Sequence, residues 1–383
     1  MPRPKKTLFH FTKQYHIRDY KFSLVGLVFA LSVFGVLVIG SAQESVQNKQ
    51  ILGLALGLIS MVIVSLIDYV WLMNLYWLIY IAVVGILGAV LVIGENVNGA
   101  RRWINIGFTN FQPSELAKIL LIIFFARFLM DNEKTVSKPL TVAKFAGLCA
   151  VPLFLIFKEP NLSTTICVAL ILVLLIYVGG LSYKFMGIMV AIVVPLITIF
   201  VLIVIQPGQK LLEDYQQKRI LAFIEPDEYA SDTAYQQNNA VMAIGSGMLT
   251  GKGLNNNTTT SVKNGNFISE PQTDFIFAIV GEELGFIGCS IVIALLLFIV
   301  IQCILIGLRA PDPGGRIICC GVGGLIGIQS FINIAVNTKL LPNTGLPLPF
   351  VSYGLTSLVS LYIGIGLVLN VGLQSNKYID SVV

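Results

Sequence analysis

Long apolar runs separated by short polar segments make up most of the chain. Runs of about 20 apolar residues have the length of a helix that crosses a bilayer, and they lack the alternation of outer-membrane strands. The pattern therefore predicts an all-α polytopic membrane protein with ten transmembrane helices. We place these helices at residues 22–40, 51–67, 70–94, 116–130, 145–157, 162–179, 184–205, 274–307, 317–337 and 350–372.

One long polar segment, residues 206–272, separates the seventh and eighth runs. We interpret residues 1–383 as a single membrane domain that contains this large extracytoplasmic loop. Within the loop, residues 210–224 can form an amphipathic helix, and residues 235–253 hold an apolar stretch too short to span. The short stretch predicts a half-helix that returns to the membrane interface. Its glycines around Lys252 resemble a phosphate loop, but the Walker spacing fails because Gly253 follows the lysine.

Composition and charge agree with a membrane protein. The chain is 56% hydrophobic and 12% charged, with a formal net charge of +5, and no soluble chain of this length would leave so much apolar surface to cover. The basic residues are scattered over loops, which gives no sign of nucleic-acid binding. Their excess on one side of the runs predicts, by the positive-inside rule, that both termini are cytoplasmic.

Cysteines and histidines limit the chemistry. All six cysteines lie in apolar runs, which is typical of packing and implies no disulfide framework. The only histidines are His10 and His16, near the N-terminus. Chemistry in the polar segments must therefore use carboxylates, Lys and Arg, which excludes His-based triads and Cys/His zinc sites.

Asp274 is the main candidate for a functional carboxylate. It lies where the polar loop gives way to the eighth apolar run, and a carboxylate at the lip of a bilayer is costly unless it is paired or used. On a helix it would share a face with Ala278, Gly281 and Gly285, a bare face that another helix or a ligand can approach. The alternative is that Asp274 only caps the helix.

Other polar residues gather in the predicted outer segments. Glu115 and Lys118 form an i, i+3 pair at the start of the fourth run and suit either a cleft or a structural ion pair. Arg101, Arg102 and Trp103 suit either the same cleft or anchoring at the interface. The turn at 158–161 contains Glu159, and the segment 340–356 is rich in Pro and Gly, which predicts an irregular cleft wall.

Five motifs occur in order along the chain: RRWINIGFTNFQPSELAK, KEPNLST, KRILAF followed by YQQNNAVMAIGSGMLTGKG, EPQTDFIFAIVGEELGFIG and TGLPLPFVSYG. Together with the ten predicted helices and one large loop, they resemble the SEDS family (shape, elongation, division, sporulation), which includes RodA, FtsW and SpoVE. The GNFISEPQTDFIF and SGMLTGKG forms resemble the RodA branch. Two positions depart from the family pattern: Asn161 stands where Asp is frequent, and Leu355 replaces a glycine.

This resemblance implies a peptidoglycan glycosyltransferase. Such an enzyme polymerises lipid II at the outer face of the bacterial cytoplasmic membrane, for elongation and cell shape. Asp274 matches the family's essential aspartate and is expected to act as the catalytic base on the acceptor hydroxyl, with inversion at the donor sugar. The residues expected to bind substrate, including the pyrophosphate, are Lys49, Arg101, Arg102, Trp103, Glu115, Lys118, Glu159, Arg219 and Lys252. No metal-binding motif is visible, which leaves open a divalent cation that bridges the pyrophosphate and a carboxylate.

Two other functions stay open at this point: a lipid II flippase or transporter, and a non-catalytic scaffold for a transpeptidase. The sequence shows no two-fold internal repeat of the kind common in transporters. The resemblance also implies partners, namely a class B penicillin-binding protein and the elongation machinery. Glycines in the ninth run either receive that partner or pack the run against its own bundle; they are Gly321, Gly323, Gly324 and Gly327.

Overall fold

The computed structural model describes residues 19–97, 100–105, 107, 110–206, 209, 212–225, 228, 233–255, 261 and 267–374. The elements of the first half, in chain order, are α1 (Phe22–Ala42), α2 (Glu44–Leu66), α3 (Tyr69–Asn74), α4 (Tyr76–Ile93), β1 (Glu95–Val97), β2 (Ala100–Asn105), β3 (Asn110–Phe111), α5 (Pro113–Asp131), the short 3-10 helix η2 (Glu133–Thr135), α6 (Pro139–Lys158) and α7 (Leu162–Val178). The second half contains α8 (Tyr183–Val204), α9 (Asp214–Ile224), α10 (Thr233–Ser246), α11 (Ile276–Leu308), α12 (Pro313–Asn337) and α13 (Leu355–Gln374).

The predicted class, a helical multi-pass membrane protein, is confirmed. Among the described residues, eight helices are long and apolar enough to cross a bilayer: α1, α2, α4, α6, α8, α11, α12 and α13. Two further predicted spans coincide with α5 and α7. The α7 helix is apolar but has 17 residues, and α5 carries Glu115, Lys118, Arg127 and Asp131 along its 19 residues. The count of ten therefore stays a prediction.

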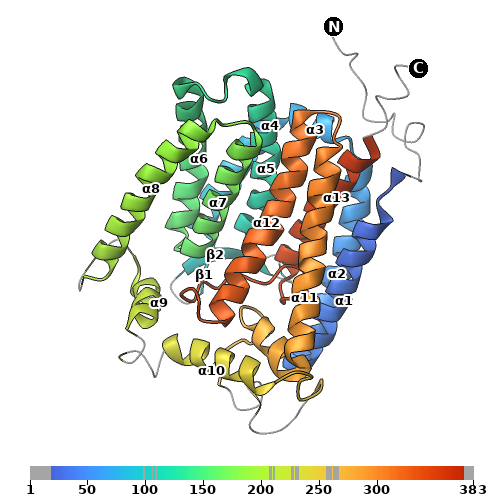
Figure 1. Cartoon of the computed structure of the whole chain (residues 1–383), viewed down its shortest axis with the longest axis vertical. Helices are drawn as coiled ribbons and strands as arrows, with labels where there is room; N and C mark the ends of the chain where they lie inside the picture. Colours follow the sequence, from blue (N-terminus) through green and yellow to red (C-terminus); the bar gives the residue numbers. More distant parts are fainter. Residues whose placement is uncertain are drawn as a thin grey trace.

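The bundle is centred on α12 and α13. In the apolar 18-residue stretch of α13, 83% of the residues are buried inside the protein. The corresponding share for α8 is 6%, and this helix lies at the edge of the bundle (Figure 1). Small residues let the central helices approach closely. A Cβ on Gly57 of α2 would lie 2.4 Å from the ring of Tyr362 in α13, and one on Gly366 would lie 2.7 Å from a backbone oxygen of α2.

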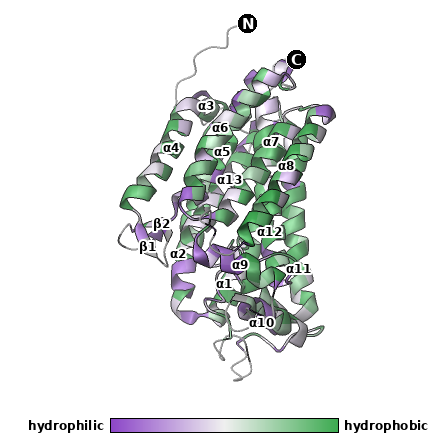
Figure 2. Cartoon of the chain, turned by 90° about the vertical axis from the view of Figure 1, so that its left-hand side faces the viewer, coloured by the Kyte–Doolittle hydropathy of each residue, from purple (hydrophilic) through white to green (hydrophobic). Residues whose placement is uncertain are grey.

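Most of the described polar loop lies at one end of the bundle. Figure 1 shows α9 and α10 at that end, near β1 and β2, and Figure 2 shows hydrophilic residues at β1 and α9 against a mostly apolar bundle. The start of α1 and the end of α13 lie together at the other end, where a Cβ on Gly372 would be 3.5 Å from the side chain of Lys21. The predicted cytoplasmic location of both termini concerns residues 1–18 and 375–383, which lie outside the described residues.

The sequence pattern did not predict the small antiparallel sheet. Its strands run in the order β1-β2-β3, with Glu95 opposite Trp103 and Ile104 opposite Phe111. The segment is too short and too polar to show the alternation of apolar and polar residues that indicates a strand. The apolar run before it predicts a helix. The sheet holds Arg101, Arg102 and Trp103 on β2, so these residues belong to a folded outer element.

The helix that follows the polar loop also differs from the prediction. It begins at Ile276, so Asp274 precedes α11 in a turn and does not share its face. The helix is broken at Gly285, whose φ of 63° and ψ of −161° are not helical. Four backbone hydrogen bonds tie this break to the loop after α10: Lys252 N to Glu282 O (3.0 Å), Gly253 N to Glu283 O (2.9 Å), Phe286 N to Met248 O (2.9 Å) and Ile287 N to Leu249 O (3.2 Å).

Glycines make this backbone pairing possible. A Cβ on Gly251 would lie 2.2 Å from the carbonyl oxygen of Glu283, and one on Gly247 would lie 1.9 Å from that of Gly281. The bare face predicted for the start of this helix is therefore approached by another helix, since a Cβ on Gly281 would contact Ile244 of α10 at 2.8 Å. The half-helix predicted in 235–253 corresponds to α10, and the amphipathic helix predicted at 210–224 corresponds to α9.

The glycines of α12 pack inside the protein. A Cβ on Gly321 would lie 2.7 Å from Ile122 of α5, and one on Gly324 would lie 2.0 Å from Leu174 of α7. The corresponding neighbours of Gly323 and Gly327 are residues of α11. Of the two functions considered for these glycines, the structure supports packing within the bundle, so they do not form a free docking face.

Candidate active site

A cavity of about 1040 Å³ opens at the end of the bundle where α9 and α10 lie (Figure 1). Its walls come from the start of α2, β2 and β3 with the loops around them, α9, α10, the turn before α11 and the segment 343–357, which follows α12 and ends in the first turn of α13. Seven charged residues line it: Lys49, Arg102, Lys218 and Arg219 are basic, and Asp214, Glu270 and Asp274 are acidic. The site therefore combines carboxylates with several cations, which suits an anionic substrate that must also lose a proton.

Asp274 is half-buried in the wall of this cavity. Removal of its carboxylate from water raises its pKa, the nearby guanidinium of Arg219 lowers it, Glu270 raises it, and Arg102 lowers it; the net shift is upward. The turn that carries Asp274 is held from the 343–357 segment as well. Ser352 Oγ donates to the carbonyl of Thr273 (2.6 Å), and the Tyr353 N–H donates to that of Gln272 (2.9 Å).

Gly345 lies next to both Asp274 and Arg219. Its φ is +72°, which favours glycine, and a Cβ there would lie 3.2 Å from Asp274 Oδ2 and 3.3 Å from Arg219 Nη1. Both charged groups thus converge on the space above one glycine.

The α9 helix brings Arg219, Lys218 and Tyr215 to the cavity. A capping box between Glu213 and Gln216 fixes its start. The helix is tied to the turn between α6 and α7, because Tyr215 Oη (2.6 Å) and Gln216 Nε2 (2.8 Å) both donate to the carbonyl of Pro160. This short amphipathic helix is therefore held in place by side-chain to backbone hydrogen bonds.

Arg102 of β2 fixes α9 from the other side. Its Nε donates to the carbonyl of Glu159 (3.2 Å), and its Nη2 donates to Pro160 O and Tyr215 Oη. Burial lowers its pKa, Tyr215 opposes this, and Arg219 lowers it further. The guanidinium carbons of Arg102 and Arg219 lie 5.9 Å and 5.8 Å from the centre of the Tyr215 ring, within the range of cation–π attraction.

Glu159 does not line the cavity. Its side chain is fully buried, and within the described part of the chain neither carboxylate oxygen has a hydrogen-bond partner. Burial raises its pKa to about 8, although Arg102 acts in the opposite direction. The carboxyl group is therefore mainly protonated at neutral pH, and its contribution to the site is the backbone carbonyl that receives Arg102.

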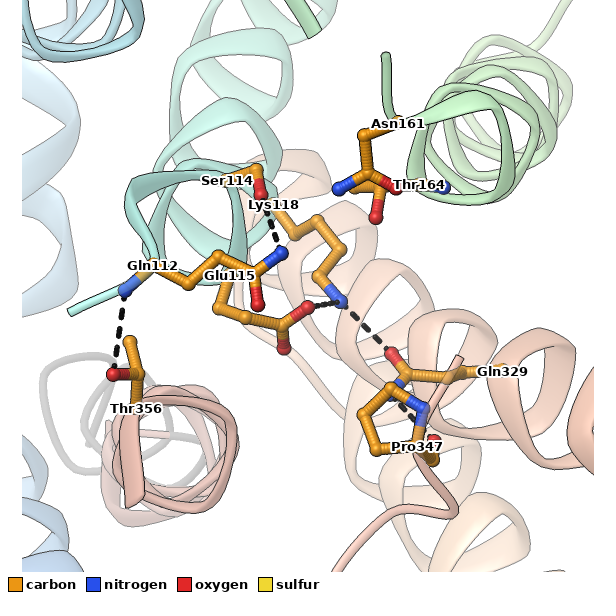
Figure 3. Close-up of polar contacts among 9 residues, drawn as sticks. All are labelled: Gln112, Ser114, Glu115, Lys118, Asn161, Thr164, Gln329, Pro347 and Thr356. Atoms are coloured by element: carbon orange, nitrogen blue, oxygen red, sulfur yellow. Dashed lines mark hydrogen bonds and ion pairs between the residues drawn. The ribbon is translucent and has the colours of Figure 1, made fainter. Parts of the chain in front are cut away.

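Glu115 and Lys118 do not line the cavity, and Figure 3 shows them next to Gln329 and Pro347. They form a buried ion pair with a distance of 2.7 Å between Lys118 Nζ and Glu115 Oε1. Lys118 Nζ also donates to Gln329 Oε1 (2.9 Å), and Gln329 Nε2 donates to the carbonyl of Pro347 (2.9 Å). Since Pro347 lines the cavity and the ion pair does not, this geometry supports the structural alternative considered for the pair.

The remaining predicted residues divide between two places. Lys49 and Trp103 line the cavity; next to Lys49, the buried Gln50 holds the other wall by hydrogen bonds to Ser352 O and from the Gly354 N–H. Arg101 is exposed and donates to Leu91 O (3.4 Å). Lys252 is ion-paired with Glu282 (2.8 Å) at the junction of α10 and α11. The cavity lining includes neither Arg101 nor Lys252.

Several residues that line the cavity were not predicted from the sequence as site residues, among them Lys218, Tyr215, Glu270, Gln236 and Tyr353. A signal existed for two of them. Within α9, Asp214 and Lys218, and likewise Tyr215 and Arg219, are four residues apart and must share a helix face. Within the described residues, no three His, Cys, Asp or Glu side chains come together as a metal site.

Known proteins match nearly the whole chain. Residues 17–377 match the family model for FtsW, RodA and SpoVE, described as cell cycle protein. The chain is 33% identical to the probable peptidoglycan glycosyltransferase FtsW of Geobacter metallireducens over 375 residues, which covers 93% of this chain and 95% of that protein. It is also 33% identical to the peptidoglycan glycosyltransferase MrdB of Escherichia coli over 355 residues, which covers 90% and 91%.

Solved structures give the same result. A chain from a study of a peptidoglycan synthase complex that coordinates polymerization and crosslinking superposes with a TM-score of 0.80 at 26% identity, covering 94% of this chain and 99% of that one. RodA, the rod shape determining protein of Thermus thermophilus, gives a TM-score of 0.69 at 26% identity, covering 93% and 97%. The fold and the site define a membrane protein of the SEDS class. The chain belongs to the FtsW, RodA and SpoVE family.

Proposed function

We propose that this protein is a peptidoglycan glycosyltransferase that polymerises lipid II at the outer face of the cytoplasmic membrane. The observation that carries the proposal is the position of Asp274 and Arg219 on either side of Gly345, in a cavity that Lys49, Lys218 and Arg102 also line. The names of the relatives supply the reaction class, and the RodA motifs of the chain favour a role in elongation and shape. Both termini are then cytoplasmic and the cavity extracytoplasmic.

The proposed reaction joins two lipid-linked sugars. A bond forms between the 4-hydroxyl oxygen of the acceptor N-acetylglucosamine and C1 of the donor N-acetylmuramic acid. The bond between C1 and the pyrophosphate oxygen breaks, and its electron pair leaves with the undecaprenyl pyrophosphate. The proton of the hydroxyl passes to Asp274, and one base acting on the acceptor accounts for inversion at C1.

The electrostatics of the cavity suit both halves of this reaction. Partial burial raises the pKa of Asp274 above its ordinary value, which makes the carboxylate a better base near neutral pH. The departing pyrophosphate gains negative charge, and the cavity cations are placed to stabilise it. We assign this role to Lys49, Lys218 and Arg219; Arg102 mainly fixes α9 through its bonds to Pro160 and Tyr215.

A transpeptidase partner belongs to the same proposal. The complex in which the structural neighbour was studied coordinates polymerization and crosslinking. By analogy, we expect a class B penicillin-binding protein to bind this chain within the elongation machinery. Tethering a crosslinking enzyme near the emerging strand raises its effective concentration without new contacts in the cavity.

The direct test is synthesis of glycan from lipid II by the purified protein in detergent. Polymer formation supports a polymerase, whereas a lipid II flippase or a scaffold yields none. Asp274→Asn keeps the size of the side chain and removes its basicity, so polymerisation should fall by ~10²–10⁴-fold. Glu133→Gln is a matched control, because Glu133 is an exposed carboxylate that does not line the cavity. Near-normal synthesis by Asp274→Asn would end the assignment of the base.

A further inference from the structure

Three amide side chains form a row on α12, and two of them, Asn333 and Asn337, donate to the turn that carries Asp274. Gln329, Asn333 and Asn337 are spaced four residues apart, so they lie on one face of the helix, and all three are fully buried. A buried amide in an apolar helix is costly unless it is hydrogen-bonded. Each of these amides donates to backbone carbonyls of the turn or of the cavity wall, so the row has a defined target.

Asn337 interrupts the hydrogen-bond ladder of α11. In an α-helix, the N–H of Ala278 would donate to the carbonyl of Asp274, four residues earlier. Here Ala278 N donates to Asn337 Oδ1 (3.2 Å) and to Phe275 O (3.0 Å), while Asn337 Nδ2 donates to the carbonyl of Asp274 (3.0 Å). One side chain therefore takes up both groups that would have extended the helix through Asp274.

Asn333 connects the same carbonyl to the opposite wall. Its Nδ2 donates to Asp274 O (2.8 Å) and to Leu346 O (2.7 Å). Leu346 follows Gly345, the residue that lies next to both Asp274 and Arg219. Asn337 Nδ2 also donates to Asn333 O (2.9 Å) and Oδ1 (3.3 Å), which fixes the two amides relative to each other.

The alternative conformation would remove Asp274 from the cavity. If α11 began one turn earlier, Asp274 would share a helix face with Ala278 and Gly281. That face packs against α10, since a Cβ on Gly281 would lie 2.8 Å from Ile244. The carboxylate would then point toward α10, away from Arg219. The turn conformation therefore decides where the carboxylate points.

We propose that Asn333 and Asn337 are positioning residues that keep Asp274 in a turn and direct its carboxylate into the cavity. This inference rests on the proposed role of Asp274 as the catalytic base. Neither asparagine lines the cavity, so they act through the backbone of Asp274 and do not touch the substrate.

The experiment compares Asn337→Ala with a buried amide elsewhere. Asn370 of α13 is also fully buried and bonds two backbone groups of another segment, Tyr69 N (2.9 Å) and Ser65 O (2.8 Å). Asn370→Ala should lower thermal stability and leave the turnover of folded protein unchanged. Asn337→Ala should lower kcat by ~10²-fold, the loss expected when a reacting group moves by about 1 Å, with little change in KM for lipid II.

The pH–rate profile separates positioning from a general loss of stability. Arg219, Arg102 and Glu270 are the charged groups that act on Asp274, and the helical conformation would move it away from the two arginines. The acidic limb of the kcat profile should therefore shift to higher pH in Asn337→Ala and stay in place in Asn370→Ala. Asn333→Ala is the second variant if Asn337→Ala does not fold, and the same shift is expected from it.

A double variant distinguishes this inference from the assignment of the base. In the Asp274→Asn background, adding Asn337→Ala should cause no further loss of rate, because there is no base left to position. If Asp274→Asn is inactive but Asn337→Ala and Asn333→Ala keep the wild-type kcat and pH profile, positioning is wrong and the base stands. If Asp274→Asn retains normal activity, the base assignment fails and positioning fails with it.

Discussion

Two lysine–glutamate pairs in this protein differ in how they are buried. In the pair of Lys118 and Glu115, both side chains are excluded from solvent, with 1% and 4% exposure. In the pair of Lys252 and Glu282, the glutamate is equally buried at 1%, but the lysine is 28% exposed. The first pair lies within α5, and the second joins the loop after α10 to α11.

This difference teaches that a charged pair in an outer segment need not belong to the active site. Both lysines looked like ligands for an anionic substrate, and neither lines the cavity. The fully buried pair is bonded to Gln329 and through it to Pro347 of the cavity wall. The half-exposed pair supports the backbone connection at Gly285. Their loss should therefore affect different parts of the molecule.

The largest effect is expected from Lys118→Met. It leaves the buried carboxylate of Glu115 without its cation and removes a partner of Gln329, and breaking a buried pair costs ~3–5 kcal/mol. Thermal unfolding in detergent should show this loss, with activity falling in parallel. Lys118→Met combined with Glu115→Leu should recover much of the stability, because no unpaired charge remains. Wild-type stability together with lost activity would instead indicate that Lys118 binds the substrate.

The next effect concerns the backbone next to the second pair. Gly251→Ala places a Cβ at a φ of +78° and 2.2 Å from the carbonyl oxygen of Glu283. Strained backbone of this kind costs ~1–3 kcal/mol, and the contact adds to it. Gly253→Ala is the matched control, because Gly253 has a φ of +90° and open space at its Cβ. Unfolding midpoints should fall further for Gly251→Ala; equal midpoints would mean that the close approach to α11 is unimportant.

A smaller effect is expected from Lys252→Met. The lysine is 28% exposed, whereas Glu282 is buried at 1% and keeps the hydrogen bond that it accepts from Ser261 Oγ (3.4 Å). The loss of stability should lie between the ~1 kcal/mol of an exposed pair and the ~3 kcal/mol at which fully buried pairs begin, and polymerisation should continue. A collapse of activity without loss of stability would instead place Lys252 among the substrate ligands.

Glu159 sharpens the comparison, because this buried carboxyl group has no lysine. Its pKa of about 8 in the folded protein exceeds the ordinary value of 4.5, so the folded state binds more protons than the unfolded state between these values. Its stabilising contribution is then full below about pH 4.5 and is lost as the pH rises to about 8.

Glu159→Gln, a neutral isostere, should therefore unfold at a higher temperature than wild type at pH 8 and at a similar temperature at pH 4.5. Glu133→Gln, at an exposed carboxylate of η2, is the control and should show no such difference between the two pH values. A constant offset between Glu159→Gln and wild type at both pH values would contradict the raised pKa.

Apolar length predicted most of the fold, since the requirement for about 20 apolar residues acts within each segment. Apolar length did not predict the structure where residues far apart in the sequence determine the local conformation. The turn at Asp274 depends on Asn337, which is 63 positions away, and its local sequence reads equally well as a helix. The sheet at 95–111 is too short to show a period.

The residues of the candidate site were predicted in part, and their side-chain partners were not. Asp274, Arg102, Trp103, Lys49 and Arg219 line one cavity, because motif positions identify residue types that the reaction needs. Side-chain partners could not be predicted: the contact of Lys118 with Gln329 joins residues 211 positions apart. Without that contact, a buried structural cation and a substrate ligand look the same in the sequence.

The break at Gly285 divides α11 into two parts that should respond differently to the thickness of the membrane. Residues 286–308 alone are about 34 Å long at 1.5 Å per residue, enough to cross a hydrocarbon core of ~30 Å. A change in membrane thickness would be met by tilting this portion, and its first amides, at Phe286 and Ile287, are bonded to Met248 and Leu249. Tilting of this portion would therefore displace the loop after α10 before it displaced Asp274. We therefore expect the rate of polymerisation to vary little among bilayers of different acyl-chain length.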